Sequence, residues 1–209
     1  MIRSFYNASS GLIYSQKGLD ITANNVANVS TTAYQTEVSS FADLLYTNIN
    51  GVANAANTQP GAQTNKISDV YIGNGTKLAK TDTVFSEGPL EQTNRNLDYA
   101  ITGDGFFAVK TSKGVEYTRD GNFHLSKQGD GSLYLASAQG GFVLDAQGHS
   151  IKVTDPDKKL NIGVYVFQNQ DSLKKVGNNL YIPTDSKAKA INNQDSLKQG
   201  FLENSTVDL

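Results

Sequence analysis

The sequence offers few residues that could do chemistry, and the clearest candidate lies in a pattern that favours a structural role. Residues Gly103 to Ala108, Gly-Asp-Gly-Phe-Phe-Ala, match the loose G-x-G-x-x-G/A dinucleotide signature. That signature needs a strand before it and a helix after it, so that a helix N-terminus meets the pyrophosphate. Here Phe106 to Lys110 continues as a strand-like run, so we expect a hairpin turn and no cofactor.

The ionisable side chains also fail to form a recognisable metal site or activated nucleophile. His124 and His149 stand apart, without the short ligand spacing of a metal site. Asp155-Pro156-Asp157 lacks the spaced oxygen ligands and the final Glu of an EF-hand loop, which predicts a solvated turn. The sequence has no cysteine, which excludes disulfides and thiolate chemistry. We therefore expect no catalytic, cofactor-binding or metal-binding residue, and an enzyme remains only if carboxylates meet in space.

The composition is that of a folded protein that binds no nucleic acid and inserts into no membrane. Hydrophobic residues make up 38% of the 209 residues, which suffices for a core, and charged residues make up only 18%. A net charge of -2 provides no basic stripe for phosphates. No run approaches the ~20 apolar residues that span a bilayer, and the N-terminus lacks an apolar signal region. The protein therefore stays in the cytoplasm or leaves it by a route without a Sec signal.

The first ~29 residues carry a seven-residue repeat, the pattern of a helix that packs along another helix. Phe5, Leu12, Leu19 and Val26 form this stripe, and two glycines lie beside it. The chain has no second long helical pattern to cover the stripe. We therefore expect a helix of another chain to cover it, although an ordinary amphipathic helix on its own domain is the alternative. The helix should end near Asn28, where a poor helical run follows.

From about Lys77 the hydrophobic period changes to two, and Gly-based turns separate short strand-like runs. This spacing predicts an antiparallel all-β domain, so the fold class is mainly β with an N-terminal α-helix. The predicted strands are 81–85, 97–101, 106–110, 115–118, 122–125, 133–135, 141–144, 162–167 and 179–182.

These patterns divide the chain into four parts. Residues 1–46 form an N-terminal helical assembly arm, in which Phe41 to Tyr46 could add a turn or two of helix. Residues 47–69 are rich in Asn, Ala, Gly, Gln and Thr, which predicts a linker or mobile loop. The all-β domain covers 70–195, and 196–209 is an extended C-terminal segment.

Three ordered motifs resemble the flagellar basal-body rod protein family. Residues Ala23 to Tyr34 match the string A-N-N-[LV]-A-N-[VS]-x-T-x-[GA]-[FY], which closes the N-terminal helix in that family. The second motif has two parts: Gly88 to Val109 resembles G-x-L-x-x-T-x-x-x-L-D-x-A-I-x-G-x-G-F-F-x-V, and Tyr117 to Phe123 resembles Y-T-R-x-G-x-F. Asn179 to Tyr181, near the end of the β domain, fits the third motif. The resemblance covers nearly the whole chain.

The resemblance implies a structural subunit of the rod, the drive shaft that carries torque from motor to hook. Family members are exported unfolded through the flagellar type III apparatus and polymerise in the cell envelope with themselves and other rod or hook subunits. Their N- and C-terminal helices form an inner tube, and their β domains form an outer layer. The motif residues would then join the stripe in the assembly interface: Asn24, Asn25, Asn28, Thr31 and Tyr34.

Two questions stay open at the level of sequence. The length of the β domain suits both proximal and distal rod subunits and is short for a hook subunit, and of the two rod positions we prefer the distal one. Family members normally continue past Ser205 to Leu209 into a long C-terminal helix, so the resemblance implies a truncated chain or an unusual member. A different class of function, an extracellular adhesin or other β-domain binding module, would be favoured by an exposed aromatic cluster on the β domain.

Overall fold

The computed structural model describes residues 2–48, 71–129, 131–155, 160–184, 188–191 and 196–208. The chain divides into two compact units: unit 1 comprises Met1–Thr22 and Val38–Asp82, and unit 2 comprises Ala23–Glu37 and Thr83–Leu209. The predicted fold class is confirmed, since antiparallel strands follow an N-terminal helix. The predicted linker at 47–69 lies, except for its first two residues, outside the described residues.

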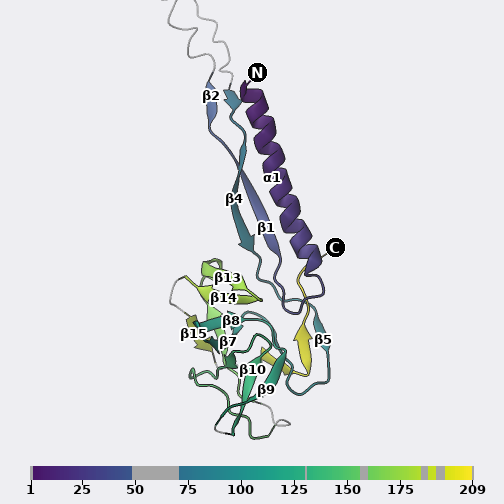
Figure 1. The fold of residues 1–209 in the computed structure, drawn as a ribbon, viewed down its shortest axis with the longest axis vertical. Helices are drawn as coiled ribbons and strands as arrows, with labels where there is room; N and C mark the ends of the chain where they lie inside the picture. The colour runs from purple at the N-terminus through teal and green to yellow at the C-terminus, as the bar shows by residue number, and fades with distance from the viewer. Residues whose placement is uncertain are drawn as a thin grey trace, which may run out of the picture. The chain divides into compact units, whose positions relative to one another are not determined.

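Unit 1 combines the first part of helix α1 (Ile2–Ala27) with paired strands. Strand β1 (Glu37–Asp43) pairs with β4 (Thr76–Thr83), and β2 (Tyr46–Asn48) pairs with β3 (Tyr71–Gly73). Figure 1 shows α1 lying alongside the β1–β4 ribbon. The less exposed side of α1 in this unit carries mostly small and polar residues, among them Asn7, Ser10, Gly11, Tyr14, Gly18 and Ile21.

Two contacts explain why small and polar residues occupy this side of α1. A Cβ added at Gly18 would lie 3.2 Å from the ring of Phe41 on β1, so glycine permits the close approach. Asn7 Nδ2 donates a hydrogen bond to the carbonyl oxygen of Gly73 at 2.8 Å. Gly18, one of the two glycines beside the apolar stripe, thus lies against a strand of its own unit.

The prediction of further helix at Phe41 to Tyr46 is wrong. This segment contains the end of β1 and the start of β2, because pairing with β4 and β3 outweighs the weak local preference for helix. The predicted boundaries also differ from the division of the structure. Residues 71–82 belong to unit 1 and not to the β domain, whereas 23–37 belong to unit 2 and not to the arm. Helix α1 ends at Ala27, which confirms the predicted end near Asn28.

Unit 2 is built on one large antiparallel sheet and two short ladders. The main path of the sheet runs β13-β14-β8-β7-β11-β10-β9, and β12 pairs with β7 and β15. Short ladders join β6 to β16 and β5 to β17, so the predicted extended C-terminal segment is paired with the rest of unit 2. The bounds are β5 (Leu90–Gln92), β6 (Tyr99–Ile101), β7 (Phe106–Thr111), β8 (Gly114–Thr118), β9 (Phe123–Lys127), β10 (Leu133–Ser137), β11 (Phe142–Val143), β12 (Val164–Phe167), a 3-10 turn (Gln170–Ser172), β13 (Leu173–Gly177), β14 (Leu180–Pro183), β15 (Ala188–Ile191), β16 (Leu197–Gln199) and β17 (Phe201–Glu203).

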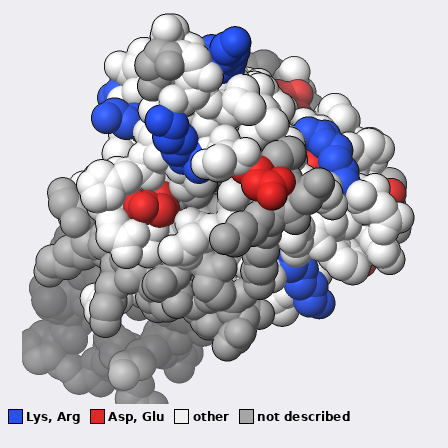
Figure 2. Space-filling view, turned by 90° about the horizontal axis from the view of Figure 1, so that it is seen from below, with Lys and Arg blue, Asp and Glu red and all other residues white. Residues whose placement is uncertain are grey.

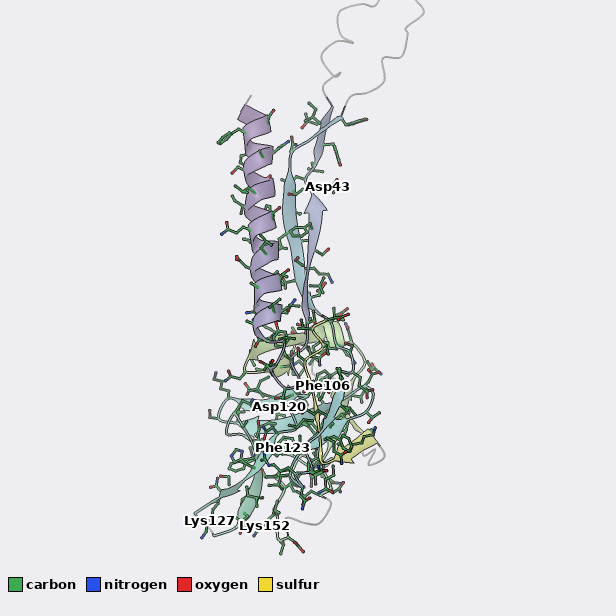
Figure 3. The ribbon with its side chains drawn as sticks, turned by 90° about the vertical axis from the view of Figure 1, so that its right-hand side faces the viewer. Asp43, Phe106, Asp120, Phe123, Lys127 and Lys152 are labelled. Carbon is green, nitrogen blue, oxygen red and sulfur yellow. The ribbon has the colours of Figure 1, made fainter. Side chains whose placement is uncertain are left out.

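Strand β7 is buried on both faces and separates two hydrophobic clusters in unit 2. Phe107 packs in one cluster with Phe123, while Phe106 packs in the other with Tyr181, because successive strand residues point to opposite faces. The rings of Phe107 and Phe123 meet edge to face with centroids 5.1 Å apart. Figure 3 shows Phe106 and Phe123 inside unit 2. Each such buried ring contributes about 1.5–3 kcal/mol of transfer free energy, which gives unit 2 a core of its own.

Candidate functional site

The apolar stripe of α1, defined as Phe5, Leu12, Leu19 and Val26, is exposed. In unit 1, Phe5 is 80% exposed, Leu12 74% and Leu19 69%. Val26, in the part of the helix that belongs to unit 2, is 46% exposed. Exposed large apolar side chains that recur on one side of a helix mark an interaction surface.

The motif residues near the end of α1 lie in a different environment, because their side chains hydrogen-bond with one another. Tyr34 is 2% exposed, and its hydroxyl lies 2.9 Å from Asn24 Oδ1 and 3.0 Å from Asn25 Oδ1. Burial, with a smaller contribution from a nearby carboxylate, raises the pKa of Tyr34. Thr31 Oγ1 donates to Asn28 Oδ1 at 3.2 Å. The structure therefore brings the five motif residues together within one chain.

Asn25 and Lys175 fix this turn from two further directions. Asn25 Nδ2 donates to the backbone oxygen of Glu37 at 2.8 Å, and Asn25 Oδ1 accepts from the Glu37 N–H at 3.1 Å. Lys175 Nζ pairs with the Glu37 carboxylate at 2.8 Å and lies 4.3 Å from the centroid of the Tyr34 ring. A cation over an aromatic face adds electrostatic attraction to the packing. The turn is thus held by amide, ionic and cation–π contacts at once.

Unit 2 also contains a buried ion pair between Arg119 and Glu203, which no sequence motif predicted. Arg119 Nε lies 2.8 and 3.0 Å from the two carboxylate oxygens of Glu203, and the side chains are 3% and 0% exposed. Arg119 Nη1 also donates to the backbone oxygens of Gly103 and Gly105 at 3.1 and 3.0 Å. All charges of the pair are therefore met by hydrogen bonds, which a buried pair requires.

Glu203 accepts further hydrogen bonds from residues at the edges of the first two motifs. Its Oε1 accepts from Gln35 Nε2 and from the backbone N–H of Gly88, both at 3.1 Å. Burial raises the pKa of the Glu203 carboxyl, and the Arg119 guanidinium together with these donors acts in the opposite direction. The guanidinium lies within 3.0 Å of both carboxyl oxygens, so it compensates part of the cost of burying the group.

The ion pair and its donors connect the end of the first motif, both parts of the second motif and the C-terminal segment. Gln35 follows the first string, Gly88 opens the second, and Arg119 lies in the Y-T-R-x-G-x-F string. Gly121 of that string is required by packing, since an added Cβ would lie 1.6 Å from the backbone oxygen of Tyr99. The adjacent Arg119 and Asp120 of this segment were the available signal for buried charged groups.

Among the residues that the structure describes, the side chains with catalytic potential are not gathered into a site. Gly103 to Gly105 precedes strand β7, as predicted, and no helix follows it. His124 and His149 are exposed. Within the described ranges no group of three or more His, Cys, Asp or Glu could hold a metal ion. In the same ranges, no helix has the length and apolar character needed to cross a membrane. Asp157 of the predicted solvated turn lies outside the described residues.

Two family models match this chain, one over helix α1 and the motif at its end and the other over most of the β strands of unit 2. Residues 5–35 match the family described as flagella basal body rod protein, and residues 100–194 match the flagellar hook protein FlgE/F/G D1 domain. These matches define the class of axial structural proteins of the flagellar rod and hook.

Similarity to individual proteins narrows this class. The flagellar basal-body rod protein FlgG of Bacillus subtilis is 36% identical over 234 residues, covering 100% of this chain and 86% of the relative. FlgG of Borreliella burgdorferi is 30% identical, again covering 100% and 86%. The hook protein FlgE of Helicobacter pylori is 36% identical but matches 62% of this chain and 18% of its own length. The chain belongs to the FlgG family of flagellar basal-body rod proteins, and it is a structural subunit of the basal-body rod in the cell envelope.

Proposed function

We propose that this subunit polymerises through the apolar stripe of α1 into the distal part of the rod, the shaft that transmits torque from motor to hook. One observation carries the proposal: three large apolar side chains at intervals of seven are 69–80% exposed on a helix whose other side lies against its own ribbon. A heptad stripe of this kind is buried when it packs against another helix. Repeated heterologous contacts between identical subunits generate an open filament.

The assignment to the rod also fixes the expected partners. We propose that the stripe contacts helices of further copies and of other rod or hook subunits, and that the flagellar export apparatus carries the chain out of the cytoplasm. Family membership supports the first group of partners, and the lack of cysteine in the sequence agrees with export of an unfolded chain. We further propose that the protein has no enzymatic activity, in keeping with relatives that are structural rod proteins.

The motif residues take a supporting role in this proposal. Asn24, Asn25, Asn28, Thr31 and Tyr34 contact one another, so we propose that they act on assembly by setting the end of α1. The stripe would then supply the contact surface itself. The adhesin alternative gains no support from the family matches.

Charged substitutions on the stripe test the proposal. Leu12→Asp and Leu19→Asp should each raise the protein concentration needed for polymer formation at least about tenfold, because a carboxylate would be buried between helices. Ile13→Asp is the matched control, because Ile13 is also an exposed apolar residue but lies about 100° round the helix from Leu12. The readouts are sedimentation of polymer and electron microscopy of basal bodies in cells. Normal rods in both stripe variants would refute the proposed interface.

A further inference from the structure

Unit 2 contains an open polar pocket of about 630 Å³ beside the turn that ends α1. We call it the Asp120 pocket. Its size lies in the range of sites that bind whole side chains or small molecules. Amide and hydroxyl groups dominate its lining: Asn24, Asn28, Thr31, Thr32, Tyr34, Asp120, Asn122, Ala138, Gln139, Lys175, Asn178 and Asn179.

Asp120 supplies this pocket with a buried negative charge. Its residue is 6% exposed, and its Oδ1 accepts a hydrogen bond from the Asn122 N–H at 3.0 Å. The remaining contacts, from Thr32 Oγ1 and Gln139 Nε2, are both long at 3.4 Å. Burial raises the pKa of the Asp120 carboxyl, and the nearby Asp98 carboxylate adds to that effect. Both carboxyl oxygens of Asp120 therefore have hydrogen-bond partners, but two of the three bonds are long and all three donors are uncharged.

The contrast with Glu203 shows what the Asp120 pocket lacks. Glu203 is matched by the Arg119 guanidinium at 2.8 Å, whereas no described Lys or Arg nitrogen lies within 4.0 Å of the Asp120 carboxylate. Lys175, the cation in the lining, pairs with Glu37. A buried carboxylate without a cation is costly, and a positively charged group entering the pocket would remove that cost.

Unit 2 carries suitable cations at another place on its surface. Lys127 and Lys152 are exposed, and neither forms an ion pair with a described residue. They flank strand β10, since Lys127 pairs with Leu133 and Lys152 with Tyr134. In Figure 3 both lie at the lower end of unit 2, while Asp120 lies in its upper half. Figure 2, seen from below, shows basic side chains in several separate places on this end.

We propose that the Asp120 pocket receives the Lys127–Lys152 end of the next copy of this chain, so that unit 2 stacks head to tail. This inference rests on the proposed function, because it requires a polymer. The acidic group and the lysines lie at separate places on one unit (Figure 3), so a contact between neighbouring copies repeats without closing on itself. Charge complementarity of this kind sets the register and the partner more than the overall affinity.

Cysteine cross-linking tests the contact directly, because the natural sequence has no cysteine. The full-length Ala138→Cys protein, substituted on the exposed lining of the pocket, is assembled with Lys152→Cys protein and treated with a short bismaleimide. We expect a cross-linked dimer of the two variants in polymer and none in monomer. Lys113→Cys, an exposed lysine on the β7–β8 turn, is the matched control and should give no dimer.

A charge reversal supplies a second and independent measurement. The double variant Lys127→Glu, Lys152→Glu should raise the concentration needed for polymer formation about tenfold, since two acidic groups would face Asp120. Lys110→Glu with Lys113→Glu makes the same change of charge on another exposed hairpin and should alter it less than about twofold. Polymer that forms without the Ala138–Lys152 dimer, or a dimer with a different rod protein, overturns this inference alone. If the unsubstituted protein forms no polymer at all, the proposed function itself fails.

Discussion

Unit 2 buries several of its phenylalanines completely, whereas unit 1 leaves Phe5 and Phe41 in contact with solvent. Phe106, Phe107 and Phe123 of unit 2 are all 0% exposed, while Phe5 and Phe41 of unit 1 are 80% and 49% exposed. Burial of large apolar side chains is the main source of folding free energy. The same residue type thus stabilises the fold in one unit and remains available for binding in the other.

The ion pairs of the two units differ in burial in the same way as the phenylalanines. Unit 2 contains a buried ion pair with further donors, Arg119 with Glu203, whereas the ion pair of unit 1, Lys80 with Asp82, is largely exposed. Buried polar groups tolerate few alternative arrangements, because each loses its hydrogen bonds when displaced. We therefore expect unit 2 to fold from its own contacts and unit 1 to gain much of its stability on assembly.

The largest effect should come from a glycine that closes unit 2. Gly121→Ala would place a Cβ 1.6 Å from the backbone oxygen of Tyr99, so a strand must move and the core must open. We expect unfolding free energy to fall by about 4 kcal/mol or more, measured by urea denaturation. Gly129→Ala is the control, because a Cβ there meets nothing within 4 Å. Equal stability of the two variants would show that unit 2 is less tightly packed than its contacts indicate.

Removing one charge of the buried pair should have the next largest effect. Glu203→Gln leaves the Arg119 guanidinium buried without a counter-charge, at a cost of about 3 kcal/mol in unfolding free energy. Asp82→Asn removes the corresponding charge from the exposed pair of unit 1 and should cost less than about 0.5 kcal/mol. Thermal and urea unfolding of both variants measure the difference. A comparable loss in the two variants would contradict the proposed division of labour between the units.

The strands of unit 2 could be predicted from the sequence better than those of unit 1, because more of their residues are buried. The strands of unit 2 were visible because alternate residues enter its two clusters, as Phe106 and Phe107 do. The ribbon of unit 1 was missed at Phe41, because its strands carry few buried residues and pair over a long stretch of chain. The hydrophobic pattern of a short segment therefore indicates which residues are buried, but it does not indicate which distant segment a strand pairs with.

Part of the candidate site could be predicted from the sequence, and part appears only in the structure. The spacing of Phe5 and Leu12 is a local property, so the stripe was found from sequence and its exposure only from the structure. The pairing of Arg119 with Glu203 joins residues 84 positions apart, and no spacing rule predicts which buried charges meet. The Asp120 pocket likewise exists only where the end of α1 meets distant turns of unit 2.

Phe5→Ala should have the smallest effect on the stability of the isolated protein. It therefore tests directly whether the exposed phenylalanines of unit 1 serve binding and the buried ones of unit 2 serve folding. Phe5 is 80% exposed, so its removal costs little packing, and alanine is the better helix former. We expect the unfolding free energy of the monomer to change by less than about 0.5 kcal/mol. Phe106→Ala, the same substitution at a buried position, should cost about 3–5 kcal/mol. Phe5→Ala should nevertheless weaken polymer formation, because the stripe would lose its largest side chain. A marked loss of monomer stability in Phe5→Ala would instead mean that the stripe is already covered within its own chain.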